Sequence, residues 1–156
     1  MKTLIVYCSK YKYHTEKIAH LFARHLKGDM VNIKDVDAVS VENYDLIGFG
    51  SGVYKERLSP KLYQVTKQWD LENKKVFVFS TSGIGMKFYN KPLIRHLISK
   101  GAIHEGSFAC KGSFNAKDFT RVRIFRLFEE QAKGHPNKQD YEKAQKFVFN
   151  LKSRLE

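Results

Sequence analysis

The chain has 156 residues, 42% of them hydrophobic, and this size and composition predict one globular domain over residues 1–156 with a sizeable core. It contains no apolar run long enough to span a membrane, and no signal peptide precedes Met1, so we expect a cytoplasmic protein. The formal net charge of +12 indicates an anionic partner, but the basic residues are scattered along the chain and match no motif that reads nucleic acid, so nucleic acid is not expected.

The first segment reads as a strand, a polar turn and a helix. Residues 2–7 form a β-branched and aromatic run typical of a buried parallel strand, and apolar residues recur at helical spacing over residues 15–26. The turn between them carries hydroxyls and lysines and ends at a helix N-terminus, where unpaired backbone N–H groups and the helix dipole favour anions. The segment therefore predicts an anion-binding loop.

The later segments repeat this order of strand, loop and helix. Their patterns predict strands at 30–33, 44–50, 76–80 and 103–110, and helices at 60–69, 91–100 and 138–155. Residues 34–43 indicate a short helix or an irregular crossover. The alternation predicts an α/β fold with a parallel sheet covered on both faces.

Single residues add detail to this outline. Ser59 and Asn137 stand where N-caps of the helices at 60–69 and 138–155 are expected, and Gly106 indicates a bulge or a close-packing position in the last strand. Cys8 and Cys110 show no metal-binding spacing, and we interpret them as buried free thiols.

Small-residue loops follow three of the predicted strands, at residues 9–15, 51–54 and 81–86. Ligands of doubly wound sheets bind outside the carboxyl ends of the strands, at the point where the strand order reverses. A strand order of 2-1-3-4-5 would bring all three loops to one edge. Their convergence favours a flavin or another phosphate-bearing ligand over three unrelated turns.

The stretch I-V-Y-C-S-K-Y-K-Y-H-T-E-K-I-A, residues 5–19, resembles the first strand, phosphate loop and first helix of the flavodoxin family. The sequence G-H-P-N at 134–137, followed by an amphipathic helix, is similar to the close of many single-domain members. The resemblance implies a flavodoxin-like three-layer sandwich, with a five-stranded parallel sheet of order 2-1-3-4-5, that binds FMN. One departure is Tyr13-His14, where the family usually has Gly-Asn, since tyrosine adopts a positive φ at greater cost than glycine.

With this resemblance, each loop has an expected role in binding FMN. The first loop would hold the phosphate through Ser9, Lys10, Tyr11, Lys12, Tyr13, His14 and Thr15. The second would face the ring with Ser51, Gly52, Val53 and Tyr54, of which Tyr54 is the aromatic wall. The third would line the ring edge with Thr81, Ser82, Gly83, Ile84 and Gly85, whose glycines allow close backbone approach. The sequence shows no catalytic nucleophile pair, zinc motif or carboxylate dyad, which favours an electron carrier over a substrate-specific oxidoreductase.

The charge bears on the partner, because the flavodoxins that the chain resembles are mostly acidic. A net charge of +12 favours redox partner proteins with an acidic docking surface, and it predicts a less negative potential for full reduction of the flavin than the family usually shows.

Two alternatives remain. Residues 119–128 alternate aromatics with arginines, which suits an anionic membrane surface and is loosely similar to the basic region of menaquinone-dependent protoporphyrinogen oxidases, FMN enzymes of the membrane surface. The other alternative is a flavodoxin-fold module that has lost FMN through the change at Tyr13-His14.

Overall fold

The computed structural model describes residues 1–10, 12–113 and 129–156, which contain a sheet whose parallel strands are ordered β2-β1-β3-β5-β6. The strands are β1 (Thr3–Cys8), β2 (Asp29–Asn32), β3 (Leu46–Tyr54), β5 (Lys75–Ser82) and β6 (Ile103–Lys111). Counted along the chain, these parallel strands have the predicted order 2-1-3-4-5, so the fold class is confirmed. An additional short strand, β4 (Arg57–Leu58), was not predicted and pairs antiparallel with the end of β3.

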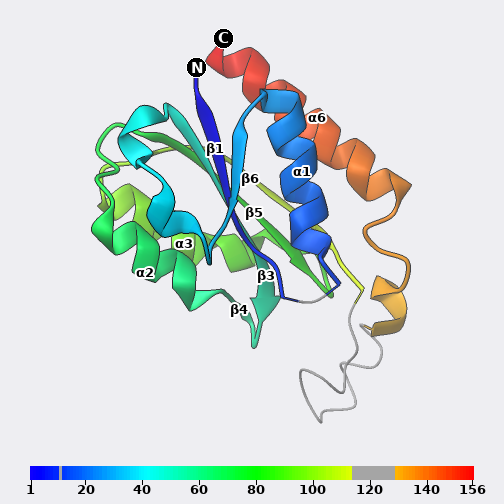
Figure 1. Ribbon diagram of the computed structural model, residues 1–156. Coiled ribbons are helices and arrows are strands. Elements are labelled where there is room, and N and C mark those ends of the chain that lie inside the picture. The colour runs from blue at the N-terminus through cyan, green and yellow to red at the C-terminus, as the bar shows by residue number, and fades with distance from the viewer. Residues whose placement is uncertain (11, 114–128) are drawn as a thin grey trace.

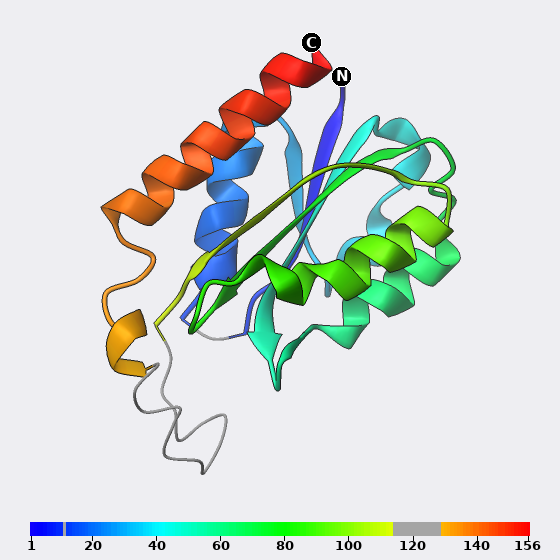
Figure 2. The same ribbon diagram turned by 180° about the vertical axis from the view of Figure 1, so that it is seen from behind.

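Helices cover both faces of the sheet, which makes the three layers that the sequence predicts. Helices α1 (His14–Leu26) and α6 (Lys138–Leu155) lie on one face, and α2 (Pro60–Gln68) and α3 (Lys91–Ser99) on the other (Figure 1, and from behind in Figure 2). Side chains of β1 alternate between the two faces: Leu4 and Val6 pack on the α2 and α3 side, and Ile5 and Tyr7 on the α1 and α6 side. Because both faces are covered, β1 is buried along its whole length.

The layer under α1 and α6 is built around the Phe22 ring. Its centroid lies 5.7 Å from that of Phe77 and 5.0 Å from that of Phe79, both in edge-on contact. Glycines of β3 make the room for these rings, since a Cβ on Gly48 would lie 2.4 Å from Phe77 Cζ and one on Gly50 2.1 Å from Phe79 Cζ. The glycines in the predicted strand 44–50 are therefore packing positions.

The predicted helix starts differ in how they are capped. Asn137 forms a capping box at α6, because the Asp140 N–H donates to Asn137 Oδ1 at 3.0 Å and the Asn137 N–H donates to Asp140 Oδ2 at 2.8 Å. Ser59 occupies the N-cap of α2, but its side chain makes no capping hydrogen bond. The cap prediction is thus confirmed in full at Asn137 and by position alone at Ser59.

Two irregular features also match the sequence. The crossover between β2 and β3 contains two short 3₁₀ turns, η1 (Val36–Ala38) and η2 (Val41–Asn43), rather than an α-helix. In β6 the register shifts so that Val76 pairs with His104 and Phe77 with Gly106, which leaves one extra residue in β6 and places the bulge at Gly106.

Cys8 and Cys110 are buried free thiols, with exposed fractions of 2% and 4%. Over the part of the chain that the structure describes, none of the helices has the length and apolar character needed to cross a membrane. Tyr11 and residues 114–128, which include the aromatic and arginine segment 119–128, lie outside the described residues.

Candidate cofactor site at the carboxyl edge of the sheet

Two hydrogen bonds join the β1–α1 segment to the ends of β3 and β5 at the carboxyl edge of the sheet, at the bottom of Figure 1. Thr15 Oγ1 lies 2.8 Å from Thr81 Oγ1, which links the start of α1 to the end of β5. The backbone N–H of Lys10 donates to Tyr54 Oη at 3.0 Å, which links the first loop to the end of β3. The structure therefore brings members of all three predicted loops to one place, as the rule for parallel sheets leads us to expect.

The backbone of the first loop adopts a conformation unusual for its residues. Lys12 has φ 51° and Tyr13 has φ 55°, both in the left-handed region, where a residue other than glycine costs on the order of 1–3 kcal/mol. Tyr13 is the N-cap of α1, its side chain makes no capping hydrogen bond, and it is 64% exposed. The loop thus takes the left-handed turn for which glycine is best suited, with tyrosine in that place.

This loop is rich in donors and positive charge. The first N–H groups of an α-helix have no acceptor within the helix, and Tyr13 supplies none from its side chain to those of α1. Lys10 Nζ lies 5.3 Å from the centroid of the Tyr54 ring, a cation–π contact at the end of β3. The helix dipole adds to this positive field, so the start of α1 suits an anion.

His14, the first residue of α1, contacts the segment that follows β6, the outermost strand of the sheet. Its Nε2 lies 2.9 Å from Ser113 Oγ, and its Nδ1 is buried without a hydrogen-bond partner among the described residues. A Cβ on Gly112 would lie 3.1 Å from His14 Cδ2, so glycine lets the chain after β6 approach the ring closely. Burial, and then the charge of Lys17, holds the pKa of His14 below its ordinary value of 6.5.

Gly112 and Ser113 belong to the site, and the sequence analysis missed both. A glycine and a serine directly after the strand at 103–110 were the available signal, because the carboxyl end of that strand lies at the same edge of the sheet.

The predicted second loop, residues 51–54, is instead the end of β3, because Ser51 and Gly52 still pair with neighbouring strands, and there Tyr54 folds back over Gly52. A Cβ on Gly52 would lie 2.6 Å from Tyr54 Oη, so this ring position requires glycine. Burial raises the pKa of Tyr54 to about 12, and the phenol is neutral at physiological pH. Ser51 is fully buried, where its hydroxyl donates to the Gly52 carbonyl at 2.6 Å and accepts from the Ser59 N–H at 2.9 Å. Ser51 therefore ties the end of β3 to the start of α2.

The third loop is shorter than predicted, because Thr81 and Ser82 still belong to β5. Ser82 Oγ accepts from the Gly85 N–H at 2.8 Å and closes the turn. Gly85 has φ 65°, and a Cβ there would lie 2.9 Å from the Lys111 backbone nitrogen, so both the conformation and the space require glycine. Gly83, Ile84 and Gly85 are half-buried, as are Ser9 in the first loop and Val53 in the second.

Residues 4–107, which contain all three loops, match a family described as flavodoxin domain. The chain belongs to the flavodoxin family. It is also 40% identical over 153 residues, 97% of this chain and 98% of the other, to an uncharacterized protein of Methanocaldococcus jannaschii.

Solved flavodoxin structures resemble this one over nearly their whole length. A flavodoxin from the domain Archaea aligns with a TM-score of 0.70 and 11% identity, covering 99% of this chain and 98% of that one. Oxidised flavodoxin 2 from Bacillus cereus aligns with a TM-score of 0.68 and 21% identity, covering 99% of both chains. At such identities the likeness shows the flavodoxin fold alone.

Proposed function

We propose that this chain binds FMN non-covalently and carries electrons between proteins, rather than acting on a substrate of its own. Membership of the flavodoxin family supports the choice of cofactor. The observation that carries the proposal is that the Thr15–Thr81 and Lys10–Tyr54 hydrogen bonds bring the β1–α1 segment and the ends of β3 and β5 together at the carboxyl edge of the sheet.

The start of α1 fits the phosphate end of FMN. Its uncapped N–H groups are donors, and Lys10 and Lys12 supply positive charge in the same loop. His14 stands where the family usually has asparagine. Its Nε2 contacts Ser113 Oγ and its Nδ1 is buried, so we assign the ring the role of holding the start of α1 against the segment after β6.

Tyr54 and the backbone of residues 83–85 fit the ring end. FMN supplies the electron chemistry when bound, and the protein has to orient the ring and shield it from water. Tyr54 is a neutral aromatic wall held in place by the Lys10 N–H, and Gly85 lets the third loop turn tightly against β6. These residues position the ring without placing a charge from Tyr54 against it.

Reconstitution tests this function. Protein stripped of flavin should turn yellow on addition of FMN and stay so after desalting, and quenching of flavin fluorescence should give the dissociation constant. Because the phosphate has its own donors, FMN should bind more tightly than riboflavin by at least about tenfold. Tyr54→Leu should weaken the binding of both flavins, while Tyr54→Phe, the matched control, keeps the aromatic wall.

Two results would contradict the proposal. Protein that stays colourless after FMN addition and desalting would be a flavodoxin-fold module without flavin. Equal affinity for FMN and riboflavin would show that the start of α1 holds no phosphate.

A further inference from the structure

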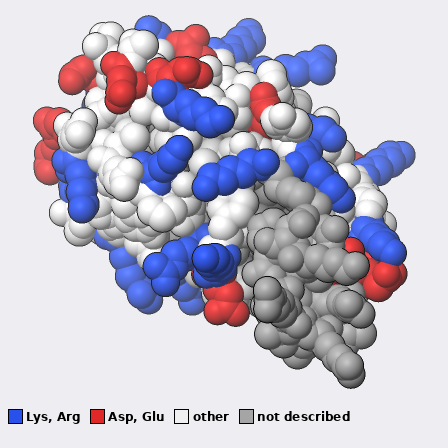
Figure 3. All heavy atoms as spheres, turned by 60° about the horizontal axis from the view of Figure 1, so that its bottom comes forward, with Lys and Arg blue, Asp and Glu red and all other residues white. Residues whose placement is uncertain are grey.

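The positive charge of the described residues gathers at the carboxyl edge of the sheet. Segments that follow the parallel strands, or that begin α1 and α3, contribute Lys10, Lys12, Lys17, Lys34, Lys55, Arg57, Lys87, Lys91 and Lys111. The acidic residues of the same segments are Glu16, Asp35, Asp37 and Glu56. Figure 3 brings this edge forward and shows lysine and arginine side chains along it. The edge therefore carries a strong positive field.

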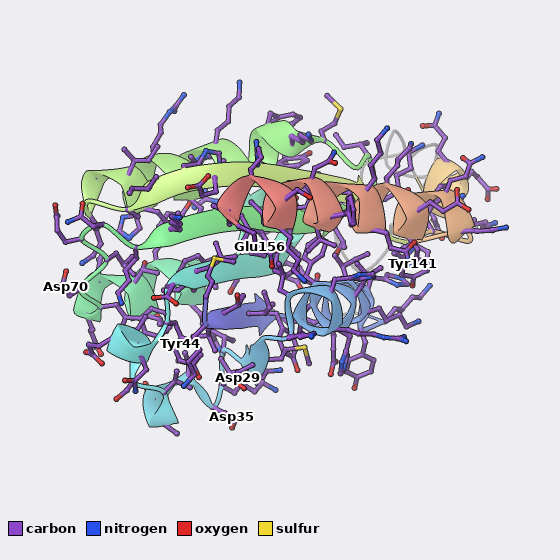
Figure 4. The ribbon with its side chains drawn as sticks, turned by 90° about the horizontal axis from the view of Figure 1, so that it is seen from above. Asp29, Asp35, Tyr44, Asp70, Tyr141 and Glu156 are labelled. Atoms are coloured by element: carbon purple, nitrogen blue, oxygen red, sulfur yellow. The ribbon has the colours of Figure 1, made fainter. Side chains whose placement is uncertain are left out.

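The opposite edge has a mixed charge. With the last turns of the helices that end there, its segments contribute Lys2, Arg24, Lys27, Lys67, Lys74, Lys75, Lys100, Lys152 and Arg154 against Asp29, Asp45, Asp70, Glu72 and Glu156. Some of these groups bind one another or the backbone, as when the Tyr44 hydroxyl donates to Asp29 Oδ2 at 2.8 Å (Figure 4, which looks onto this edge). Lys74 Nζ donates to the carbonyls of Glu42 and Tyr44. At this edge, acidic groups thus lie among the basic ones.

Exposed apolar side chains lie within the basic edge. Met86 and Phe88 are 49% and 46% exposed, on either side of Lys87 at the start of η3 (Lys87–Asn90). The Phe88 and Tyr89 rings lie 4.1 Å apart between centroids. The turn η3 contacts β4, which brings Lys55 and Arg57 of the β3–β4 hairpin next to it. We call the set Lys55, Arg57, Met86, Lys87 and Phe88 the rim patch.

The cations of the rim patch make no ion pair with a described carboxylate, although Glu56 lies between Lys55 and Arg57 in the same hairpin. Over residues 1–10, 12–113 and 129–156, the ion pairs all join residues between Glu130 and Glu156, on α6 or just before it. Lys55, Arg57 and Lys87 therefore present charge to solvent next to apolar side chains. An apolar centre with aromatic and methionine side chains and a polar charged border is the composition of protein–protein interfaces.

We propose that the rim patch is the docking surface for a protein partner with an acidic surface around an apolar centre. Such a partner would bury Met86 and Phe88 and place its carboxylates opposite Lys55, Arg57 and Lys87. Complementary charge accelerates encounter and selects the partner, while the buried apolar side chains hold the complex. This inference rests on the proposed function only for the identity of the partner as a redox protein.

The amount of exposed apolar surface favours a protein over a membrane. Membrane binding at an interface increases with the apolar area that enters the lipid, and Met86 and Phe88 are already half covered by the protein. Two half-exposed side chains give little area for insertion into lipid, but they suit the centre of a small transient protein interface.

Binding to proteins of opposite charge tests the docking surface. The probes are a small acidic [2Fe–2S] ferredoxin and a basic cytochrome c, measured by surface plasmon resonance against the full chain with and without FMN. The ferredoxin should bind and the cytochrome should not. The association rate with ferredoxin should fall steeply as salt rises from about 0.05 M to about 0.3 M, because screening weakens the attraction.

Charge reversal locates the surface. Lys55→Glu combined with Lys87→Glu should raise the dissociation constant for ferredoxin by at least about tenfold. The matched control is Lys143→Glu combined with Lys146→Glu on the exposed side of α6, which changes the net charge equally and should have an effect of less than about twofold. Phe88→Ser should weaken binding without changing its dependence on salt. Circular dichroism establishes that each variant is folded.

Three outcomes overturn the proposal. The first is that ferredoxin does not bind, and the second is that both charge-reversal pairs weaken binding equally. The third is that the rim patch binds phosphatidylserine vesicles or duplex DNA and does not bind ferredoxin. The last outcome would favour a membrane or nucleic-acid partner. Since the comparison is made with and without FMN, a failure to bind FMN leaves the result on docking readable, and the two failures are distinguishable.

Discussion

Thr15 and Thr81 share the hydrogen bond that ties helix α1 to strand β5. Their exposed fractions are 2% and 6%, and their hydroxyl oxygens lie 2.8 Å apart. Thr15→Val keeps the shape of the side chain but leaves the Thr81 hydroxyl buried without this partner. We expect the free energy of unfolding of the FMN-free protein to fall by about 1–3 kcal/mol, as measured by urea denaturation.

A double-mutant cycle separates this hydrogen bond from other effects of the substitution. In a Thr81→Val background residue 81 has no hydroxyl that could lose its partner. Thr15→Val should therefore lower the free energy of unfolding by less there than in the parent protein. An equal cost in both backgrounds would mean that the two hydroxyls do not interact, and that the first and third loops are joined in another way.

His14 should make the stability of the FMN-free protein depend on pH. Burial, then the charge of Lys17, holds its pKa below the ordinary value of 6.5, and His96 is lowered likewise by burial and by Lys100 and Lys67. The unfolded chain therefore binds more protons than the folded one once the pH falls through 6.5. The free energy of unfolding should decrease on acidification below this pH, until the pH passes below the folded pKa values.

The substitution His14→Gln isolates the contribution of this residue. Glutamine keeps a polar side chain but does not titrate, so the decrease in stability between about pH 6.5 and pH 5 should be smaller in the variant. Chemical denaturation at several pH values measures it. A variant whose stability follows the parent over the whole range would assign the pH dependence to other groups.

At the scale of an element, the loop that leads into α1 holds a left-handed tyrosine. Because Tyr13 has φ 55° and its side chain is mostly exposed, Tyr13→Gly removes backbone strain and little packing. Tyr13→Ala is the matched control, since it removes the same ring but keeps the strain. The glycine variant should be more stable than the alanine variant by about 1 kcal/mol, the reverse of their order inside a helix. Thermal and urea unfolding give this difference, and the opposite order would contradict it.

Most helices and strands could be predicted because the faces that they bury determine the spacing of their apolar residues. A strand covered on both faces must be largely apolar, as residues 76–79 are, and a helix on one face repeats its apolar residues at helical spacing. Strand β4 could not be predicted for a local reason. Its hairpin turns at Lys55 and Glu56, with φ of 49° and 63°, where glycine or asparagine is the usual signal.

At the scale of the whole molecule, the sequence analysis could predict where the loops meet but not which side chains touch. The carboxyl ends of parallel strands share an edge in any such sheet, so the convergence of three loops follows from topology. The contact of His14 with Ser113 joins residues far apart in the chain and depends on the close approach at Gly112, which no local pattern signals.

The position of the charged residues on the surface also could not be predicted from the sequence. The basic residues are scattered along the sequence, and that scatter argued against a nucleic-acid partner. Folding gathers many of them at the carboxyl edge, because each strand delivers its following loop there. The fold, and not the order of residues in the chain, therefore decides where positive charge is concentrated.

The gathered charge should affect the flavin's potentials. Full reduction of FMN leaves a negative charge on the ring, and nearby cations favour that state by Coulomb attraction. We expect the second reduction potential of the FMN-loaded protein to be less negative than that of acidic flavodoxins titrated in the same buffer. Lys87→Gln should make it more negative, and Lys143→Gln on α6 should not. A strongly negative second potential in the parent protein would refute this expectation.

The deep burial of Cys8 and Cys110 has a practical consequence. With exposed fractions of 2% and 4%, neither sulfur can meet a reagent in solution, and burial raises the pKa of the Cys110 thiol so that the reactive thiolate is scarce. Iodoacetamide should therefore leave the native chain unmodified and alkylate both sulfurs once urea opens it, as a mass spectrum of the intact chain would record. The rate of labelling without urea would then report how often the native molecule opens.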